Sequence, residues 1–378
     1  MTEQPPLLEV RDLSVTFDTD DGAVQAVDRV SYTVRRGQAL GIVGESGSGK
    51  SVSSLTVMGL TRFAGNARVS GQVLFEGRDL LGAGDEDLRS LRGGEMSMIF
   101  QDPLSSLHPF YKIGDQLIEA VRVHRDVSKS QARDRAIEML GLVGIPEPRK
   151  RIDSYPHEFS GGMRQRVMIA MGLINDPKLL IADEPTTALD VTVQAQILEL
   201  LERLQRELDT AIVLITHDLG VVAEVTDEIA VMYAGRIVER GTKESIFAAP
   251  QHPYTWGLLR SIPRLDLPRG EALTPIPGRP PSLILRPEGC AFHPRCAYAR
   301  AVCREAVPEL EGAAGPGGHT VACTIPQGMR AGLWSALDAG TPAPEAMAQV
   351  GLQPDPVSEP AAAAAAAVAQ VDPGEGAA

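Results

Sequence analysis

The sequence lacks any run of about 18 or more consecutive apolar residues, and its first residues do not have the basic-then-apolar layout of a signal peptide. We therefore expect a cytoplasmic protein that does not itself span a membrane, so any work at a membrane needs partners. Basic residues are in the minority, 36 against 49 acidic ones, and the net charge of −13 argues against a surface that coats nucleic acid. Cysteine is scarce too. In a cytoplasmic setting its four copies favour a metal site or no special role over disulfides.

The chain does contain enough apolar material for a globular protein. Hydrophobic residues make up 43% of 378 residues, which suffices for one large domain and a smaller one. Apolar residues alternate along residues 8–17 and 26–34, which predicts two strands joined by a turn at 20–22. An apolar spacing of three to four residues over 111–143 predicts a helical insertion. Short apolar runs predict further strands at 39–43, 72–75, 96–100, 179–184 and 211–216.

Residues 44–51, Gly-Glu-Ser-Gly-Ser-Gly-Lys-Ser, fit the pattern G-x-x-x-x-G-K-[ST] between a predicted strand and a helical run over 51–60. Strand, glycine turn and helix form the context of a phosphate-binding loop. Its glycines let backbone N–H groups converge on phosphates, Lys50 reaches the outer phosphates and Ser51 offers a hydroxyl to Mg²⁺. An ordinary glycine-rich turn also matches the pattern, so the neighbouring motifs decide. The predicted nucleotide-contacting residues are Gly44, Glu45, Ser46, Gly47, Ser48, Gly49, Lys50 and Ser51.

Polar side chains end three of the predicted strands. Asp183 and Glu184 close the run that begins at residue 179, where an acid beside a phosphate-binding loop can hold Mg²⁺ and its neighbour can orient or deprotonate an attacking water. Gln101 ends a second strand and points toward the ligand crevice of an α/β fold. His217 ends a third, where it can touch a γ-phosphate. The alternative is that these acids are solvated loop residues and that the histidine is structural.

A second possible anion site is Ser160-Gly161-Gly162, at the start of a predicted helix over 167–174. One nucleotide needs only one cradle, so we interpret the second as serving a nucleotide held by another copy of the fold. A plain helix cap without a ligand is the alternative. Phe17, upstream of the phosphate-binding loop, fits either stacking on a nucleotide base or a place in the core.

In order and character, these motifs resemble those of ABC-type ATPases. The resemblance implies an α/β fold with a P-loop, a mixed core sheet, an antiparallel β subdomain and a helical subdomain, and it implies ATP and Mg²⁺ as ligands. Two such subunits would sandwich two ATP molecules, each between the Walker A loop of one and the signature of the other. The signature here has Phe159 and Met163 at ends that vary within the family. The matching segments are Gly44–Ser51 (Walker A), Gln101 (Q-loop), Ser160–Gln165 (signature), Asp183–Glu184 (Walker B), Asp190 (D-loop) and His217 (H-loop).

The resemblance also implies a role for each of these residues. Glu184, His217 and Gln101 are expected to act in catalysis, and Ser51, Gln101 and Asp183 are expected around Mg²⁺. The remaining implied nucleotide contacts are Phe17, Ser160, Gly161, Gly162, Gln165 and Asp190.

Longer stretches resemble the oligopeptide/dipeptide importer branch of this family. They lie at residues 98–109, 159–170 and 252–255, and the Gly-Gly-Met-Arg-Gln-Arg version looks like the D-type ATPase subunit. The resemblance covers about residues 6–326. It implies ATP-driven peptide import from the cytoplasmic face of the membrane, with a second, F-type ATPase subunit, two transmembrane permease subunits and an extracytoplasmic peptide-binding protein, and with no nucleic acid.

Other functions stay open at this point. Members of this branch also import nickel chelates or other small solutes, and ABC ATPases include exporters and non-transport enzymes acting on DNA or ribosomes. The short span between Ser51 and Ser160 leaves no room for the long coiled coil of DNA-repair relatives. A single acidic domain differs from the paired domains and basic linker of translation factors.

Composition predicts the domain boundaries. We expect an ATPase domain over 1–248 with a helical subdomain over about 102–160, a C-terminal extension over 249–330, and a disordered Ala/Pro-rich tail over 338–378. Within the extension, the Pro-rich segment 262–287 favours extended chain over a packed element.

The four cysteines lie in the predicted extension, with gaps of five, six and nineteen residues between them. Four thiolates suit zinc or an iron–sulfur cluster, and unliganded thiols are the third possibility. Structural zinc usually takes ligands paired about two to four residues apart, so the wide gaps favour a larger object, and the resemblance implies the same occupant. We therefore predict a structural [4Fe–4S] cluster. Its expected ligands are Cys290, Cys296, Cys303 and Cys323.

Overall fold

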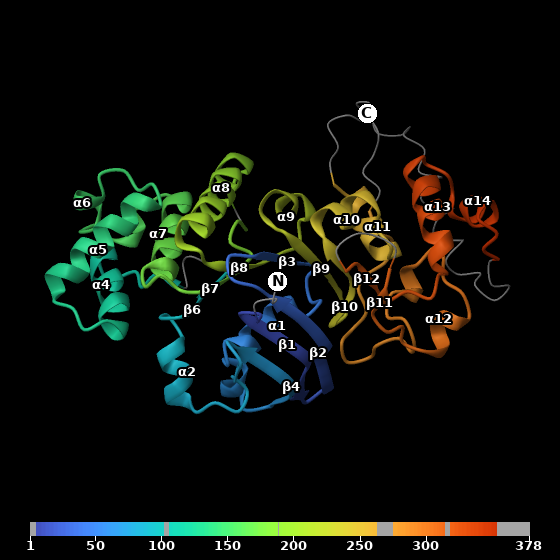
Figure 1. Ribbon diagram of the computed structural model, residues 1–378, viewed down its shortest axis with the longest axis horizontal. Helices are drawn as coiled ribbons and strands as arrows, with labels where there is room; N and C mark the ends of the chain where they lie inside the picture. Colours follow the sequence, from blue (N-terminus) through green and yellow to red (C-terminus); the bar gives the residue numbers. More distant parts are fainter. Residues whose placement is uncertain (1–4, 102–105, 188, 263–274, 314–317, 354–378) are drawn as a thin grey trace, which may run out of the picture. The chain divides into compact units, whose positions relative to one another are not determined.

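The computed structural model describes residues 5–101, 106–187, 189–262, 275–313 and 318–353 (Figure 1). The chain forms two compact units, Met1–Glu228 and Ile229–Ala378.

An antiparallel sheet opens the first unit, as the alternating apolar pattern predicts. Its strand order is β2-β1-β4-β5, and the hairpin of β1 and β2 closes where Thr19 faces Gly22. Alternate residues are buried on both sides of a register shift in β1, Leu8 and Val10 before it and Leu13 and Val15 after it, which is the pattern of a sheet with one covered face. The strands are β1 (Leu8–Thr19), β2 (Gly22–Val34), β4 (Ala67–Phe75) and β5 (Arg78–Asp79).

A parallel sheet forms the core of the same unit, in the order β3-β8-β7-β6. Its strands are nearly continuous runs of buried apolar residues, as expected for a sheet covered on both faces. Because the strands are parallel, their carboxyl ends meet at one edge, where ligands bind in open α/β sheets. The strands are β3 (Ala39–Val43), β6 (Met96–Ile99), β7 (Leu179–Asp183) and β8 (Ala211–Thr216).

Helices α4, α5, α6 and α7 lie together in the first unit (Figure 1), and the predicted helical insertion is confirmed as α4 and α5. Their buried faces pack on one another and share one apolar core, with Leu117, Met139 and Ile169 inaccessible. Ser128 caps α5 in a reciprocal capping box with Gln131. The helices of this unit are α1 (Lys50–Val57), α2 (Asp85–Leu91), α4 (Ile113–His124), α5 (Lys129–Leu142), α6 (Pro148–Arg151), α7 (Gly161–Leu173), α8 (Val191–Leu208) and α9 (Leu219–Val225), with 3-10 turns at Thr61–Ala64 and Pro156–Glu158.

The second unit packs helices around a small sheet. In this sheet β12 pairs antiparallel with β10 on one side and with β11 on the other. A buried polar group ties the sheet to the segment after α10: Glu239 accepts hydrogen bonds from the His319 ring at 2.8 Å and from the backbone N–H groups of Gln251 and His252. The elements are β9 (Glu228–Tyr233), β10 (Arg236–Thr242), β11 (Glu311–Gly312), β12 (Thr320–Val321), α10 (Lys243–Ala248), α11 (Pro253–Arg260), α12 (Val302–Glu305), α13 (Gln327–Asp338) and α14 (Ala343–Gln349), with a 3-10 turn at His293–Arg295.

The tail differs from its prediction over residues 343–349, which form α14 instead of disordered chain. Ala346 and Met347 are buried, so packing holds a helix that its composition does not announce. The alanine run further on lies outside the described residues. In the Pro-rich segment, residues 275–287 form no helix or strand, and 263–274 lie outside the described part.

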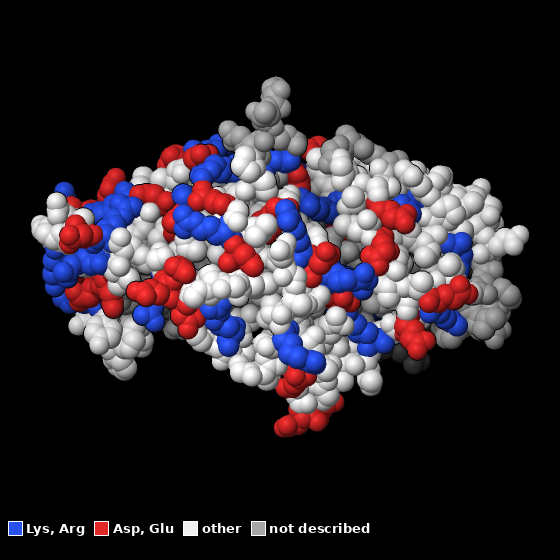
Figure 2. Space-filling view, turned by 60° about the horizontal axis from the view of Figure 1, so that its bottom comes forward, with Lys and Arg blue, Asp and Glu red and all other residues white. Residues whose placement is uncertain are grey.

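Charges of both signs are mixed on the face drawn in Figure 2. Several are paired, for example Arg133 with Asp153 at 2.7 Å. Exposed pairs of this kind contribute roughly 0–1 kcal/mol each, so buried apolar side chains carry most of the stability of the fold. Among the described helices, none is long and apolar enough to cross a membrane.

Candidate nucleotide-binding site

The loop after β3 turns through two glycines with left-handed backbone. Gly47 has a φ of 78° and Gly49 a φ of 96°, values that residues with a side chain rarely adopt. Gly49 directly precedes α1, and no side chain caps that helix. The first N–H groups of α1 and the positive end of its dipole therefore point into a place that suits a phosphate group.

Lys50 folds back over this loop. Its ammonium donates hydrogen bonds to the carbonyl oxygens of Gly44 at 2.7 Å and Glu45 at 3.0 Å, and the side chain is only 4% exposed. Burial lowers the pKa of Lys50, while the carboxylates of Glu184 and Asp183 act in the opposite direction. The cation thus sits between the loop and the acids at the ends of the neighbouring strands, where negative phosphate oxygens are favoured.

Ser51 and Asp183 bring two oxygens together from different elements. The Ser51 hydroxyl at the start of α1 donates to Asp183 Oδ1 at the end of β7, at 3.0 Å. Asp183 is only 6% exposed, and burial raises its pKa although the Ser51 hydrogen bond lowers it. A hydroxyl and a carboxylate at this separation are the donor set that Mg²⁺ prefers beside phosphates, so the residues fit the ion.

Glu184 lies one residue beyond Asp183 in a left-handed conformation with a φ of 46°. Its N–H donates to Ile215 O at 2.9 Å, which continues the pairing of β7 with β8. Gln101 Nε2 donates to Glu184 Oε2 at 3.0 Å, and His217 Nδ1 lies 3.4 Å from Oε1. Thr187 also donates to Oε2, at 2.9 Å. Sequence reasoning did not single out Thr187, although a hydroxyl three residues after an acid, with proline between them, signals a turn that faces the acid.

The parallel register explains why these groups meet. Val43 pairs with Thr216, and Asp183 pairs with Ile215, so the residues that follow these strands emerge at the same edge. Four of the predicted motifs therefore converge here, through Lys50, Ser51, Gln101, Asp183, Glu184 and His217.

The Ser160-Gly161-Gly162 segment lies elsewhere in the same unit. The Ser160 hydroxyl caps α7 by accepting from Met163 N at 3.3 Å. A Cβ on Gly162 would lie 2.8 Å from Val193 Cγ1, so this glycine permits close packing against α8. The described contacts of the segment are with α7, α8 and Leu189, not with the Walker A loop. This geometry accounts for a helix cap and leaves the segment's implied contact with a second nucleotide as a prediction.

Three further predicted contacts are placed as follows. Asp190 caps α8, with its Oδ1 accepting from Val193 N at 2.9 Å. Gln165 is buried on α7, and its Nε2 has no partner in the described part of the chain. Phe17 is half-buried on β1, opposite Val24 and Ala67, so its base-stacking role stays a prediction.

Comparison with known proteins decides the family. Residues 27–187 match a family described as "ABC transporter", and residues 238–303 match a family described as "Oligopeptide/dipeptide transporter, C-terminal region". The oligopeptide transport ATP-binding protein OppD of Salmonella typhimurium is 55% identical over 302 residues, covering 80% of this chain and 89% of the relative. The dipeptide transport ATP-binding protein DppD of Bacillus subtilis is 54% identical over 302 residues, covering 80% and 90%. The chain belongs to the ATP-binding subunits of oligopeptide/dipeptide ABC transporters.

Solved structures of ABC cassettes share the fold. A dimeric post-hydrolysis state of the ATP-binding cassette MJ0796, bound to ADP and Pi, is 25% identical with a TM-score of 0.56, covering 62% of this chain and 98% of that one. The cassette cbiO1 from Clostridium perfringens is 28% identical with a TM-score of 0.56, covering 65% and 92%. The predicted ABC fold class is confirmed. Membership of this ATPase family also confirms ATP as the hydrolysed substrate and Mg²⁺ as its ion.

The predicted iron–sulfur cluster is wrong. All four cysteines lie in the described residues as free thiols, yet no group of three or more His, Cys, Asp or Glu side chains in that part of the chain is arranged to hold a metal ion. Burial raises the pKa of Cys290, raises that of Cys296 strongly, and raises that of Cys323 to about 12. Cys303 Sγ lies 3.2 Å from the Thr324 hydroxyl. Protonated, buried thiols behave as small apolar side chains, whereas cluster ligands are thiolates.

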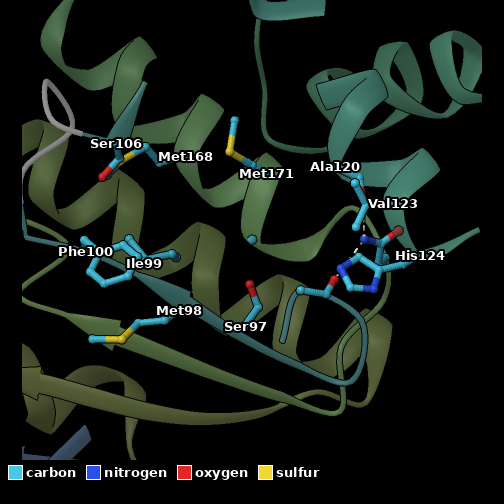
Figure 3. Close-up of a pocket in the computed structure, with 13 residues that line it drawn as sticks. Ser97, Met98, Ile99, Phe100, Ser106, Ala120, Val123, His124, Met168 and Met171 are labelled. Carbon is cyan, nitrogen blue, oxygen red and sulfur yellow. Dashed lines mark hydrogen bonds between the residues drawn. The ribbon is translucent and has the colours of Figure 1, made fainter. Parts of the chain in front are cut away.

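A separate cavity of about 310 Å³ opens in the first unit beside the end of β6 (Figure 3). Apolar side chains from β6, α4 and α7 form its walls, among them Ile99, Val123 and Met171, and Phe100 adds to them just after β6. Asn175 lines it too and ties α4 to the turn before β6, because its Nδ2 donates to Gly93 O at 2.8 Å and Ala120 O at 2.9 Å. The remaining lining residues are Gly93, Ser97, Met98, Ser106, Ala120, His124, Met168 and Gly172.

Proposed function

We propose that this chain is the ATP-hydrolysing subunit that powers an importer of di- and oligopeptides. The support is its identity of more than half with ATP-binding proteins named for oligopeptide and dipeptide transport, over about four fifths of the chain. The match of residues 238–303 to the C-terminal region of these transporters extends the likeness beyond the ATPase core. The comparisons do not support the alternatives of nickel import, export, or action on DNA or ribosomes.

The single observation that carries the chemistry is the convergence of Lys50, Ser51, Asp183 and Glu184 at one sheet edge. In the proposed mechanism the loop N–H groups and Lys50 bind the phosphates, while Ser51, Asp183 and Gln101 would hold Mg²⁺. When bound, the ion would supply positive charge beside the outer phosphates. Glu184 then accepts a proton from the attacking water, and His217 contacts the γ-phosphate.

Partners follow from the same proposal. Ser160, Gly161, Gly162, Gln165 and Asp190 would contact the nucleotide of a second ATPase subunit, an F-type chain. Two transmembrane permease subunits and an extracytoplasmic peptide-binding protein would complete the importer, with this chain at the cytoplasmic face of the membrane. We also propose that Phe17 stacks on the adenine base.

The cavity beside β6 is our candidate contact for a permease loop. Its walls are apolar, and Phe100, which is 43% exposed, adjoins Gln101 in sequence. A permease loop that displaced Phe100 would therefore act one residue from Gln101, whose amide donates to Glu184. We retain the ATPase domain at 1–248, its helical subdomain at about 102–160 and the extension at 249–330 as part of this proposal.

Glu184→Gln tests the mechanism. The amide keeps the shape of the side chain but does not accept the proton, so ATP turnover in the assembled complex should fall about 10²- to 10⁴-fold. ATP binding, measured by equilibrium dialysis, should persist. Glu199→Gln, at an exposed position of α8, makes the same chemical change away from the site and should leave turnover unchanged. Near-normal hydrolysis by Glu184→Gln would show that another group is the base.

A further inference from the structure

A tight turn follows the candidate base. Thr187 N–H donates to Glu184 O at 3.2 Å, which closes a four-residue turn with Pro185 at its second position. Proline fixes its own φ and favours that position. The turn brings the Thr187 hydroxyl back over the Glu184 side chain, where it donates to Oε2 at 2.9 Å.

The backbone of Glu184 is unusual in the same place. Its φ of 46° lies in the left-handed region, which is strained for a residue with a side chain and persists only where the surroundings enforce it. Two backbone bonds do so here, from Glu184 N to Ile215 O and from Thr187 N to Glu184 O. The orientation of the carboxylate is then decided by its own hydrogen-bond donors.

These donors differ in where they come from. Gln101 and His217 follow strands β6 and β8, so their distances to Glu184 depend on how those segments lie. Gln101 is also a proposed ligand of Mg²⁺ through its Oε1, so its position would depend on the ion as well as on Glu184. Thr187 is three residues from Glu184 on the same turn and moves with it.

We propose that Thr187 is a positioning residue that orients the Glu184 carboxylate for water activation. This rests on the proposed role of Glu184 as the general base. With Oε2 bonded to the hydroxyl, Oε1 faces the water: an O–H bond of the water breaks, its proton passes to Oε1, and the resulting hydroxide attacks the γ-phosphorus as the bond to ADP breaks.

The test compares two substitutions in the full chain, assembled with its partner subunits. Thr187→Val keeps the shape of the side chain and removes the donor, so kcat should fall about tenfold, the value of one hydrogen bond to a charged group, with KM for ATP unchanged. Thr187→Ser retains the hydroxyl and should restore most of the rate. Thr192→Val, at an exposed position of α8, makes the same change away from the acid and should have no effect.

A double mutant separates this proposal from the mechanism beneath it. In a Glu184→Gln background, Thr187→Val should cause no further loss, because the hydroxyl acts through the carboxylate. Wild-type kcat in Thr187→Val, or an equal loss in Thr187→Ser, would overturn the positioning role while leaving Glu184 as the base. Near-normal turnover in Glu184→Gln would instead overturn the general-base assignment.

Discussion

Acid should weaken the second unit through His252, and the effect can be isolated with one substitution. His252 is buried at the start of α11, where its Nδ1 accepts a hydrogen bond from Tyr254 N at 3.0 Å. The pKa of His252 is lowered to about 3, mainly by burial and also by the nearby Arg330 guanidinium, while a hydrogen bond to the Ala322 backbone acts in the opposite direction. The carboxylate of Glu239 accepts a hydrogen bond from the backbone N–H of His252 and not from its ring, so it does not stabilise a proton on the ring.

The direction follows from proton binding in the two states. Below the ordinary histidine pKa of 6.5, His252 binds a proton in the unfolded chain, whereas in the folded unit it binds one only near pH 3. The free energy of unfolding therefore falls as the pH drops from 6.5 toward 3, and it is unaffected above about pH 7.5. Between pH 7.5 and pH 5 this single group should remove about 2 kcal/mol.

The chain carries its own probe for this measurement. Both of its tryptophans, Trp256 and Trp334, lie in the second unit, with ring centroids 6.4 Å apart. Urea unfolding followed by tryptophan fluorescence at pH 7.5 and pH 5 therefore reports the stability of this unit. His252→Asn is the matched control, because asparagine also caps a helix start but does not titrate.

The compared quantity is the free energy lost between the two pH values, so any cavity left by asparagine cancels. The wild type should lose about 2 kcal/mol more than His252→Asn over this interval. Equal losses in the two proteins would refute the assignment of a depressed pKa to this histidine.

Two further predictions concern the nucleotide sites. Ser160→Arg should leave nucleotide binding by this subunit nearly normal and abolish its ATP-dependent association with the second ATPase, measured by light scattering. Ser160→Ala controls for the lost helix cap, which is worth about 1 kcal/mol. If Ser160→Arg lost both properties, the segment would only support the fold. Mg²⁺ affinity should fall with decreasing pH, starting at a higher pH than the ordinary aspartate value of 3.8 implies, because burial raises the pKa of Asp183 and protons compete with the ion. A flat profile in magnesium titrations, equal to that of Asp183→Asn, would contradict this.

Much of the site could be predicted because its parts follow strands. Asp183 and Glu184 end an unbroken apolar run, and Gln101 and His217 end two others. A run of that kind signals a buried parallel strand, and parallel strands end at one edge. The helical insertion was predictable for a similar reason, since its apolar spacing is local.

The cysteines show where spacing stops being informative. The spacing along the chain shows which thiols could approach one another. It does not predict how each side chain is oriented or how far it is buried. Burial is a tertiary property, and it is burial that raises the pKa of Cys296 and Cys323 and disfavours their thiolate forms. The helix α14 was not predicted for the same reason: the burial of Ala346 and Met347 depends on tertiary packing, which composition does not reveal.

The site groups are bonded to one another, which ties nucleotide binding to the orientation of the base. Lys50 bonds two loop carbonyls, Ser51 bonds Asp183, and Gln101 bonds Glu184. In the proposed mechanism Lys50 would exchange its bonds to the loop carbonyls for bonds to phosphate oxygens, so the net free energy of binding is a difference between bonds made and bonds given up. The bond from Gln101 Nε2 to Glu184 Oε2 depends on how the segment after β6 lies. Thr187 donates to the same oxygen from the turn that carries Glu184, so under our proposal this donor stays with the base wherever the segment after β6 lies.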